Sequence, residues 1–275
     1  MKNIKSIIIN KIKQNGPISL SEFMTISLYH EKYGYYVSKK PIGKEADFIT
    51  SPEISQVFGE LIGVWLCDTW QKILNKKENV FVELGPGNGT LMTDVIRAVK
   101  TINNGFIKKS SSIYCVEKSK YFIKNISKNI ALSDINIIEN VSNIPKKMSF
   151  IIANEFFDVL PANQFIKVNN VWHERLISLK NNNELIFCSS NKPSKYNSIL
   201  PKNFSDGEIT EIPSSSISII SYLSKHICEY TGLLLIIDYA KDDNDKYGGL
   251  RSIKKHSFTN PLSNPGSQDL SIKVD

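Results

Sequence analysis

The sequence of 275 residues lacks the patterns of metal sites, disulfide frameworks and membrane spans. Its four cysteines include no Cys-x-x-Cys pair, which leaves zinc motifs and a disulfide framework without support and is typical of a reducing compartment. His173 and His256 have no metal-ligand spacing around them. The longest apolar run covers residues 232–238, whereas a membrane helix needs roughly 18–20 residues. We therefore expect neither a metal ion nor a membrane span.

The sequence also lacks a segment in which basic residues are concentrated. Lysine and arginine total 34 against 27 aspartates and glutamates, for a net charge of +7 and a pI near 9.0, but the lysines occur along the whole chain. Nucleic acid is therefore not expected as a partner. The N-terminus is basic and apolar, yet it has no arginine and no small-residue cleavage site, and Ile4, Ile8 and Ile12 recur at helical spacing. We expect it to be the first amphipathic helix of a cytoplasmic protein.

Residues 1–78 are predicted to form a mainly helical N-terminal region. Ser19 and Glu22 have the spacing of a capping box at the start of a helix. Residues 51–53 (Ser-Pro-Glu) predict another start, with serine at the cap, proline at the first helical position and a carboxylate in the first turn. We expect that helix to reach Leu74 and to carry one wide apolar face. The face comprises Ile54, Val57, Phe58, Leu61, Ile62, Trp65 and Leu66.

From residue 79 onward, short apolar runs alternate with helical patterns. Strands are expected at residues 80–84, 112–117, 135–139, 150–153 and 233–238, and helices at residues 90–99 and 121–130. This alternation predicts an α/β fold with a doubly wound, Rossmann-like parallel sheet that has helices on both faces. Further strands at residues 165–168, 171–179 and 184–187 predict a β-rich insertion at about residues 162–212. The predicted domains are therefore residues 1–78 and residues 79–275.

The most specific motif lies between a predicted strand and a predicted helix. It comprises Glu83, Leu84, Gly85, Pro86, Gly87, Asn88, Gly89 and Thr90. A dinucleotide site needs Gly-x-Gly-x-x-Gly so that a pyrophosphate can lie on the helix N-terminus, but here Thr90 occupies the position of the third glycine. Glu83 would also repel a phosphate. An acid before a glycine loop suits a cationic ligand instead, such as the amino group of a methionine moiety.

A second acid, Glu117, ends the next predicted strand, where a carboxylate can accept hydrogen bonds from ribose hydroxyls. Each motif alone has a non-functional explanation. The glycine turn can be merely a tight connection between a strand and a helix, and Glu117 can be a solvated side chain with no ligand. In this order and at this interval, the two motifs favour S-adenosylmethionine as the ligand. A nicotinamide cofactor is the less favoured alternative.

The glycine motif resembles the first motif of class I S-adenosylmethionine-dependent methyltransferases. Residues 34–36 (Gly-Tyr-Tyr), 47–55, 58–59 and 154–161 narrow the resemblance to the MidA-type family. Residues 172–175, 211–213, 238–239, 250–251, 261–262, 265–266 and 269–270 are similar to the same family, so that the resemblance runs from about residue 17 to residue 275. This family includes the mitochondrial assembly factor of respiratory complex I that methylates an arginine of a complex I subunit.

The resemblance implies methylation of a protein arginine linked to complex I assembly. The residues expected to bind the cofactor are Glu83, Gly85, Pro86, Gly87, Gly89, Glu117, Thr50 and Pro52. Thr50 and Pro52 would form a lid together with Asp47 and Glu53, although a helix cap explains Ser51 and Glu53 equally well. Because arginine stays protonated, its site needs carboxylates that match the guanidinium fork.

The acceptor carboxylates expected at the end of the strand at residues 150–153 are Glu155 and Asp158, with Asn154 beside them. A hydrogen-bonded turn is the structural alternative for Asn154 and Asp158. Members of the family commonly continue beyond the length of this chain, so we expect a shortened C-terminus with incomplete sheet coverage. The alternative function is a catalytically silent assembly or scaffold protein that retains the methyltransferase fold, and a nicotinamide-dependent oxidoreductase is a third reading.

Overall fold

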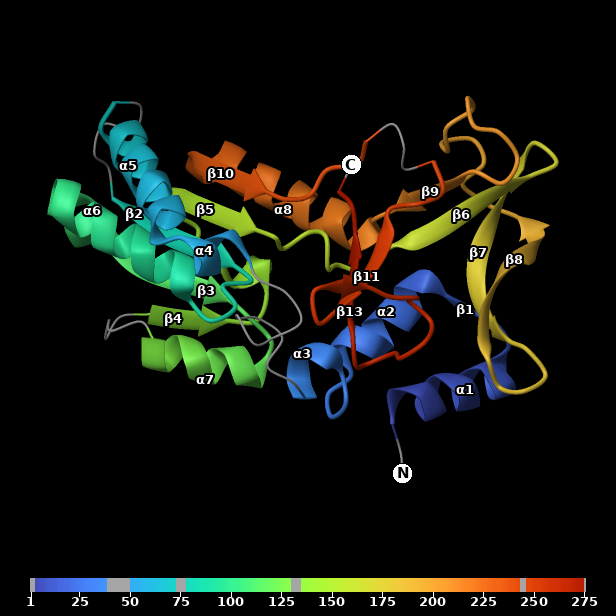
Figure 1. The fold of residues 1–275 in the computed structure, drawn as a ribbon. Helices are drawn as coiled ribbons and strands as arrows, with labels where there is room; N and C mark the ends of the chain where they lie inside the picture. Colours follow the sequence, from blue (N-terminus) through green and yellow to red (C-terminus); the bar gives the residue numbers. More distant parts are fainter. Residues whose placement is uncertain (1–2, 39–49, 73–77, 130–134, 243–245, 275) are drawn as a thin grey trace. The chain divides into compact units, whose positions relative to one another are not determined.

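The computed structural model describes residues 3–38, 50–72, 78–129, 135–242 and 246–274 (Figure 1). The chain divides into two compact units, each assembled from separate segments. One comprises residues 1–41, 157–217 and 238–275, and the other comprises residues 42–156 and 218–237. We call them the insertion unit and the sheet unit.

The sheet unit is built on five parallel strands. They are β2 (Asn79–Leu84), β3 (Ser110–Val116), β4 (Ile135–Ile138), β5 (Ser149–Asn154) and β10 (Gly232–Ile237), in the order β10-β5-β2-β3-β4. All six residues of β2 are buried, as is typical of a central parallel strand covered on both faces. The predicted α/β fold with a parallel, Rossmann-like sheet is confirmed. Among the described residues, the edge strand β10 pairs only with β5.

Helices connect these strands. They are α4 (Ser51–Ile54), α5 (Gln56–Lys72), α6 (Thr90–Lys109), α7 (Lys120–Asn129) and most of α8 (Ser214–Tyr230). A short 3-10 turn, η1 (Val141–Asn143), precedes β5. Figure 1 shows α5 and α6 lying side by side. Because α6 begins directly after the glycine motif, its first turn lies at the carboxyl end of β2.

The single helix predicted from Ser51 to Leu74 is wrong. Ser55 has an extended backbone that separates α4 from α5, and the N-cap position of α4 is Thr50, which makes no side-chain cap bond. The predicted apolar face is also only partly buried, since Ile54 is 72% and Leu61 64% exposed.

Glycines decide which face of α5 packs against α6. A Cβ atom at Gly59 would lie 2.6 Å from the Cβ of Asp94, and one at Gly63 would lie 2.9 Å from the Cβ of Ala98. The two helices therefore approach each other where α5 has no side chains, and the larger apolar residues on its other side stay exposed. This close approach is possible only because glycine lacks a Cβ atom.

The insertion unit begins with helices. They are α1 (Ile4–Asn15), α2 (Leu20–Tyr29) and α3 (Tyr35–Ser38), with the two-residue strand β1 (Ile18–Ser19) before α2. The predicted burial of Ile4, Ile8 and Ile12 on α1 is confirmed. Ser19 caps α2 by accepting a hydrogen bond from the backbone N–H of Glu22 at 3.1 Å, as its spacing predicts.

Two antiparallel sheets complete the insertion unit. The larger sheet contains β6 (Asn163–Val168), β7 (Val171–Leu179), β8 (Leu185–Pro193), β9 (Ile209–Ile212) and β1. The smaller contains β11 (Leu250–Lys254), β12 (Ser257–Phe258) and β13 (Asp269–Ile272). The strands expected at residues 165–187 are thus present, and β8 extends further than its pattern predicts. Of the helices that the structure describes, none combines the length and the hydropathy of a membrane-spanning segment.

Candidate functional site

The glycine motif forms a tight loop between β2 and α6. Gly85, Gly87 and Gly89 have φ values of 62°, 55° and 81°, in the left-handed region that favours glycine. The backbone N–H of Gly89 donates to the carbonyl oxygen of Pro86 at 2.8 Å and closes a turn. A Cβ atom at Gly85 would lie 2.8 Å from the ring of Phe156. The predicted need for glycine at these positions therefore has a structural basis.

Glu83 lies in β2, two residues before Gly85, and only 4% of its surface is exposed. Its carboxylate accepts a hydrogen bond from the backbone N–H of Met92, in the first turn of α6, where a helix N-terminus favours negative charge. Burial nevertheless raises the pKa of Glu83 from 4.5 to about 8. The second oxygen, Oε2, is buried and has no hydrogen-bond partner in the described residues. A buried acceptor without a protein partner fits a site that takes its donor from a ligand.

Glu117 follows β3, one strand away from the glycine loop. The sheet register pairs Leu84 with Val116, and the backbone N–H of Gly85 donates to the carbonyl oxygen of Val116 at 3.0 Å. The carboxylate oxygen Oε1 of Glu117 accepts hydrogen bonds from the backbone N–H groups of Lys118 at 2.8 Å and Ser119 at 2.7 Å. These bonds fix the carboxylate at the carboxyl end of β3. Burial raises the pKa of Glu117.

The short helix α4 is connected to the glycine loop by Glu53. Its Oε1 atom accepts hydrogen bonds from the hydroxyl of Thr90 at 2.7 Å and from the amide nitrogen of Asn88 at 3.3 Å. Thr50 and Pro52 are buried in the same turn. Asp47, the fourth residue expected in a lid, lies outside the described residues. The contact between Glu53 and Asn88 joins positions 35 residues apart, and the sequence offers no signal for it.

Glu155 lies at the carboxyl end of β5, beside β2 in the sheet, where the register pairs Leu84 with Ala153. Asn154 is the last residue of β5 and is paired with Ile237. Glu155 itself has a φ of 49°, which is uncommon for a residue other than glycine. Its carboxylate oxygen Oε1 accepts a hydrogen bond from the backbone N–H of Ser51 at 3.3 Å. The structure therefore brings Asn154 and Glu155 to the same edge of the sheet as Glu83 and the glycine loop.

Asp158 belongs to the insertion unit. The backbone N–H groups of Phe157 and Asp158 donate to Oδ2 of Asp238 at 2.9 and 3.3 Å. The hydroxyl of Tyr36 donates to Oδ1 of Asp269 at 2.8 Å, and burial, together with the charges of Asp269 and Asp158, raises the pKa of Tyr36. Asp158 thus lies near a buried tyrosine and a second aspartate, and motif reasoning did not connect these residues.

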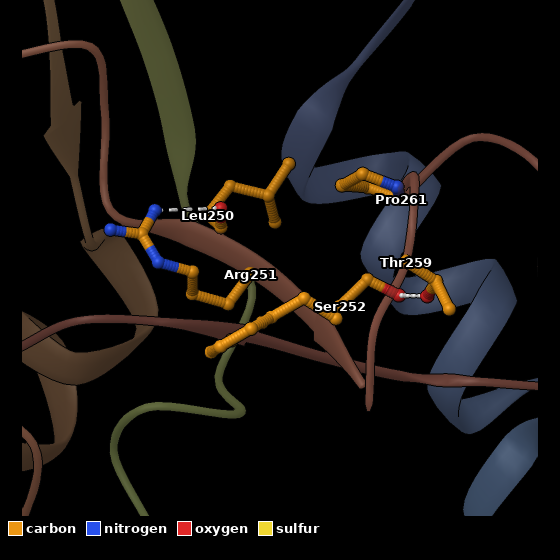
Figure 2. A pocket seen from close by; sticks show the side chains of 6 residues that line it. Leu250, Arg251, Ser252, Thr259 and Pro261 are labelled. Atoms are coloured by element: carbon orange, nitrogen blue, oxygen red, sulfur yellow. Dashed lines mark hydrogen bonds between the residues drawn. The ribbon is translucent and has the colours of Figure 1, made fainter. Parts of the chain in front are cut away.

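A pocket of about 200 Å³ lies in the C-terminal segment of the insertion unit (Figure 2). Figure 2 shows the hydroxyls of Ser252 and Thr259 joined by a hydrogen bond, while the Arg251 guanidinium donates to a backbone carbonyl. None of the predicted site residues lines this pocket. Within the part of the chain that the structure describes, no group of three or more His, Cys, Asp and Glu side chains is placed to hold a metal ion.

A parallel sheet whose strand ends carry a glycine loop and acidic side chains defines a class of nucleoside-cofactor enzymes. The sequence model of one family, described as "Putative S-adenosyl-L-methionine-dependent methyltransferase", matches residues 61–275. A crystal structure of a Burkholderia thailandensis protein bound to S-adenosyl-homocysteine shares the fold, with a TM-score of 0.81 and 18% identity over 99% of this chain and 73% of that one. The chain belongs to this family of S-adenosylmethionine-dependent methyltransferases, and S-adenosylmethionine is its cofactor.

Curated relatives carry a more specific name. A Danio rerio protein named "Protein arginine methyltransferase NDUFAF7, mitochondrial" is 31% identical over 297 residues, which cover 100% of this chain and 70% of the relative. Its Xenopus tropicalis counterpart is 33% identical over 98% of this chain and 68% of its own length. These names point to mitochondria, so the cytoplasmic location expected from the sequence is wrong. The helical spacing of the N-terminus correctly predicts a packed helix, but packing does not specify a compartment.

Proposed function

We propose that this methyltransferase modifies an arginine side chain of a protein, and that the acceptor is a subunit of respiratory complex I. The names of the curated relatives support a protein arginine as the acceptor. The family resemblance of residues 34–36, 47–55 and 154–161 supports the link to complex I. The observation that carries the proposal is the position of Glu155, a carboxylate at the strand end beside the glycine loop.

The proposed cofactor site comprises Glu83, Gly85, Pro86, Gly87, Gly89, Glu117, Thr50 and Pro52. Oε2 of Glu83 would accept a hydrogen bond from the amino group of the methionine moiety, because it is buried and has no described protein partner. Glu117 would hold the ribose from the end of β3. Thr50 and Pro52 would cover the cofactor from α4. The cofactor supplies the transferable methyl group when it is bound.

The proposed acceptor residues are Glu155, Asp158 and Asn154. A guanidinium is planar, carries several N–H donors and stays protonated at neutral pH. Glu155 would orient the reacting nitrogen by accepting one of its N–H groups, and its carboxylate can take the proton that this nitrogen loses when a methyl group is added. Asp158 would neutralise the rest of the guanidinium charge, and Asn154 would hold it by a hydrogen bond. Orientation of this kind accounts for a large part of the rate in such displacements.

Methyl transfer to matched acceptors tests the proposal. Purified protein is incubated with methyl-labelled S-adenosylmethionine and isolated complex I subunits, and the products are mapped by mass spectrometry. We expect methylarginine at a defined site and no label after that arginine is replaced by lysine. Glu155→Gln should lower kcat at least 100-fold with little change in cofactor affinity, because it removes the carboxylate that takes the proton. Glu139→Gln, in an exposed position, serves as the matched control.

Two results would contradict the proposed acceptor chemistry. Label on lysine, on a small molecule or on nucleic acid, with none on arginine, would refute the arginine assignment. Unchanged turnover of Glu155→Gln on an arginine substrate would remove Glu155 from the acceptor site while leaving the reaction itself in place.

A further inference from the structure

The glycine loop is held by its polar residues. Three of its positions are glycines with positive φ, and glycine loses more conformational freedom on ordering than any other residue. The backbone hydrogen bonds of Gly85 and Gly89 offset part of this cost, and the residues between the glycines can fix the loop further. Pro86 does so through its ring, which restricts φ. The remaining non-glycine positions are Asn88 and Thr90, and both have side chains bonded to Glu53.

Asn88 forms hydrogen bonds with residues of two other elements, α4 and α7. Its amide nitrogen donates to Oε1 of Glu53 at 3.3 Å, and its Oδ1 accepts from the amide nitrogen of Asn125 at 3.1 Å. The amide nitrogen of Asn129 donates to the backbone oxygen of Asn88 at 3.0 Å. Asn125 and Asn129 lie on α7, one turn apart, and α7 begins just after Glu117. Asn88 therefore links the glycine loop to α4 on one side and to the helix that follows Glu117 on the other.

Glu53 completes this network from outside the loop. Its Oε1 atom accepts the hydroxyl of Thr90 at 2.7 Å, the first residue of α6, in addition to the amide of Asn88. Hydrogen bonds to an ionised carboxylate are shorter and stronger than those between neutral groups. A single carboxylate on α4 thus joins Asn88, within the loop, to Thr90, the first residue of α6.

We propose that Glu53 and Asn88 are positioning residues that hold the glycine loop in the conformation that binds the cofactor. Neither needs to contact the cofactor, because their effect acts through the loop backbone. This inference rests on the proposed placement of the cofactor at the glycine loop, and it assigns that placement to a specific pair of side chains. Fixing the loop before binding removes an ordering cost from the binding step.

An exchange of donor and acceptor tests the pair. Asn88→Asp places a carboxylate against Glu53, which abolishes their hydrogen bond and adds repulsion, while an oxygen remains to accept from Asn125. In the double variant Glu53→Gln/Asn88→Asp, the new amide at position 53 can donate to the new carboxylate at position 88 and still accept the Thr90 hydroxyl. Glu53→Ala removes both bonds, whereas Glu53→Gln keeps an oxygen for both. Ile54→Ala changes the next residue of α4, which is 72% exposed, and is the matched control.

Affinity for S-adenosylhomocysteine is measured by calorimetry for each full-length variant, with a melting temperature as the second measurement. We expect Glu53→Ala and Asn88→Asp to weaken binding 10- to 100-fold, Glu53→Gln to weaken it less than threefold, and the double variant to recover at least tenfold over Asn88→Asp. The melting temperatures of the ligand-free variants should not follow this order, because a merely structural role would move both together.

Three outcomes overturn the inference. Equal binding by Glu53→Ala, Asn88→Asp and the wild type shows that the loop needs neither residue. Failure of the double variant to recover affinity shows that the two side chains do not act as a pair. Binding that is insensitive to these variants and also to Gly87→Val places the cofactor elsewhere, which refutes the proposed cofactor site as well as this inference, so the two failures are distinguishable.

Discussion

The buried carboxylate of Glu83 gives this protein a specific dependence of stability on pH. Burial raises the pKa of Glu83 from 4.5 to about 8 in the ligand-free fold. At about 1.4 kcal/mol for each tenfold change in proton affinity, ionising Glu83 in the folded state costs on the order of 5 kcal/mol. A group whose pKa is raised by folding contributes stability that is fully present below pH 4.5 and is lost as the pH rises through about 8. Glu83 therefore lowers the stability of the ligand-free protein progressively between about pH 4.5 and pH 8, and the loss is complete above pH 8.

Glu83→Gln isolates this contribution because it keeps the side-chain shape and removes the titration. The free energy of unfolding is measured by urea denaturation of both proteins between pH 5 and pH 9. We expect the variant to gain stability relative to the wild type as the pH rises, by several kcal/mol at pH 9. Glu184→Gln, in an exposed turn, controls for the loss of one negative charge. A stability difference that stays constant across this pH range would refute the reasoning.

Cofactor binding should reverse the sign of this effect. An amino group that donates to Oε2 of Glu83 favours the carboxylate, so binding at pH 7 should release close to one proton. Calorimetry in buffers of different ionisation enthalpy measures that release directly. The affinity of the wild type should rise from pH 6 to about pH 7.7, above which an α-amino group loses its own proton. Proton release by the wild type that equals that of Glu83→Gln would place the amino group away from this carboxylate.

Other predictions concern packing and buried charges inside each unit. Gly63→Ala should cost about 1–3 kcal/mol of stability in urea denaturation, because the new methyl group would lie 2.9 Å from the Cβ of Ala98; an unchanged midpoint would show that α5 and α6 can separate freely. Burial lowers the pKa of His226, so stability should fall as the pH drops below 6.5, and His226→Gln should flatten that fall in the same assay. Glu211→Ala should cost about 3 kcal/mol because Glu211 is buried against Lys241 at 2.6 Å, and a loss below 1 kcal/mol would contradict this.

Much of the fold could be predicted from local patterns. The apolar run at residues 80–84 and the helical spacing of Ile4, Ile8 and Ile12 depend on neighbours in the chain, and the structure confirms the strand and the helix. The left-handed backbone of the glycine loop could be predicted for the same reason, since the freedom to adopt a positive φ is a local property of glycine. The sequence pattern misses the break of the helix at Ser55 because the apolar spacing continues across it. Serine is a favoured residue at a helix start, and the Ser55 hydroxyl accepts a hydrogen bond from the backbone N–H of Val57 at 3.3 Å, at the beginning of α5.

The sequence by itself determined the order of strands and helices, the loop with positive φ and the acids at the strand ends, because these depend on side-chain period and backbone sterics over a few residues. Only the tertiary structure decided which face of α5 is buried, since the approach to α6 is set by Gly59 and Gly63 rather than by the larger apolar side chains. It also decided that Glu53 bonds the glycine loop and that Glu83 keeps one oxygen without a protein partner. Contacts and burial of this kind arise between segments far apart in the chain, and no local pattern encodes them.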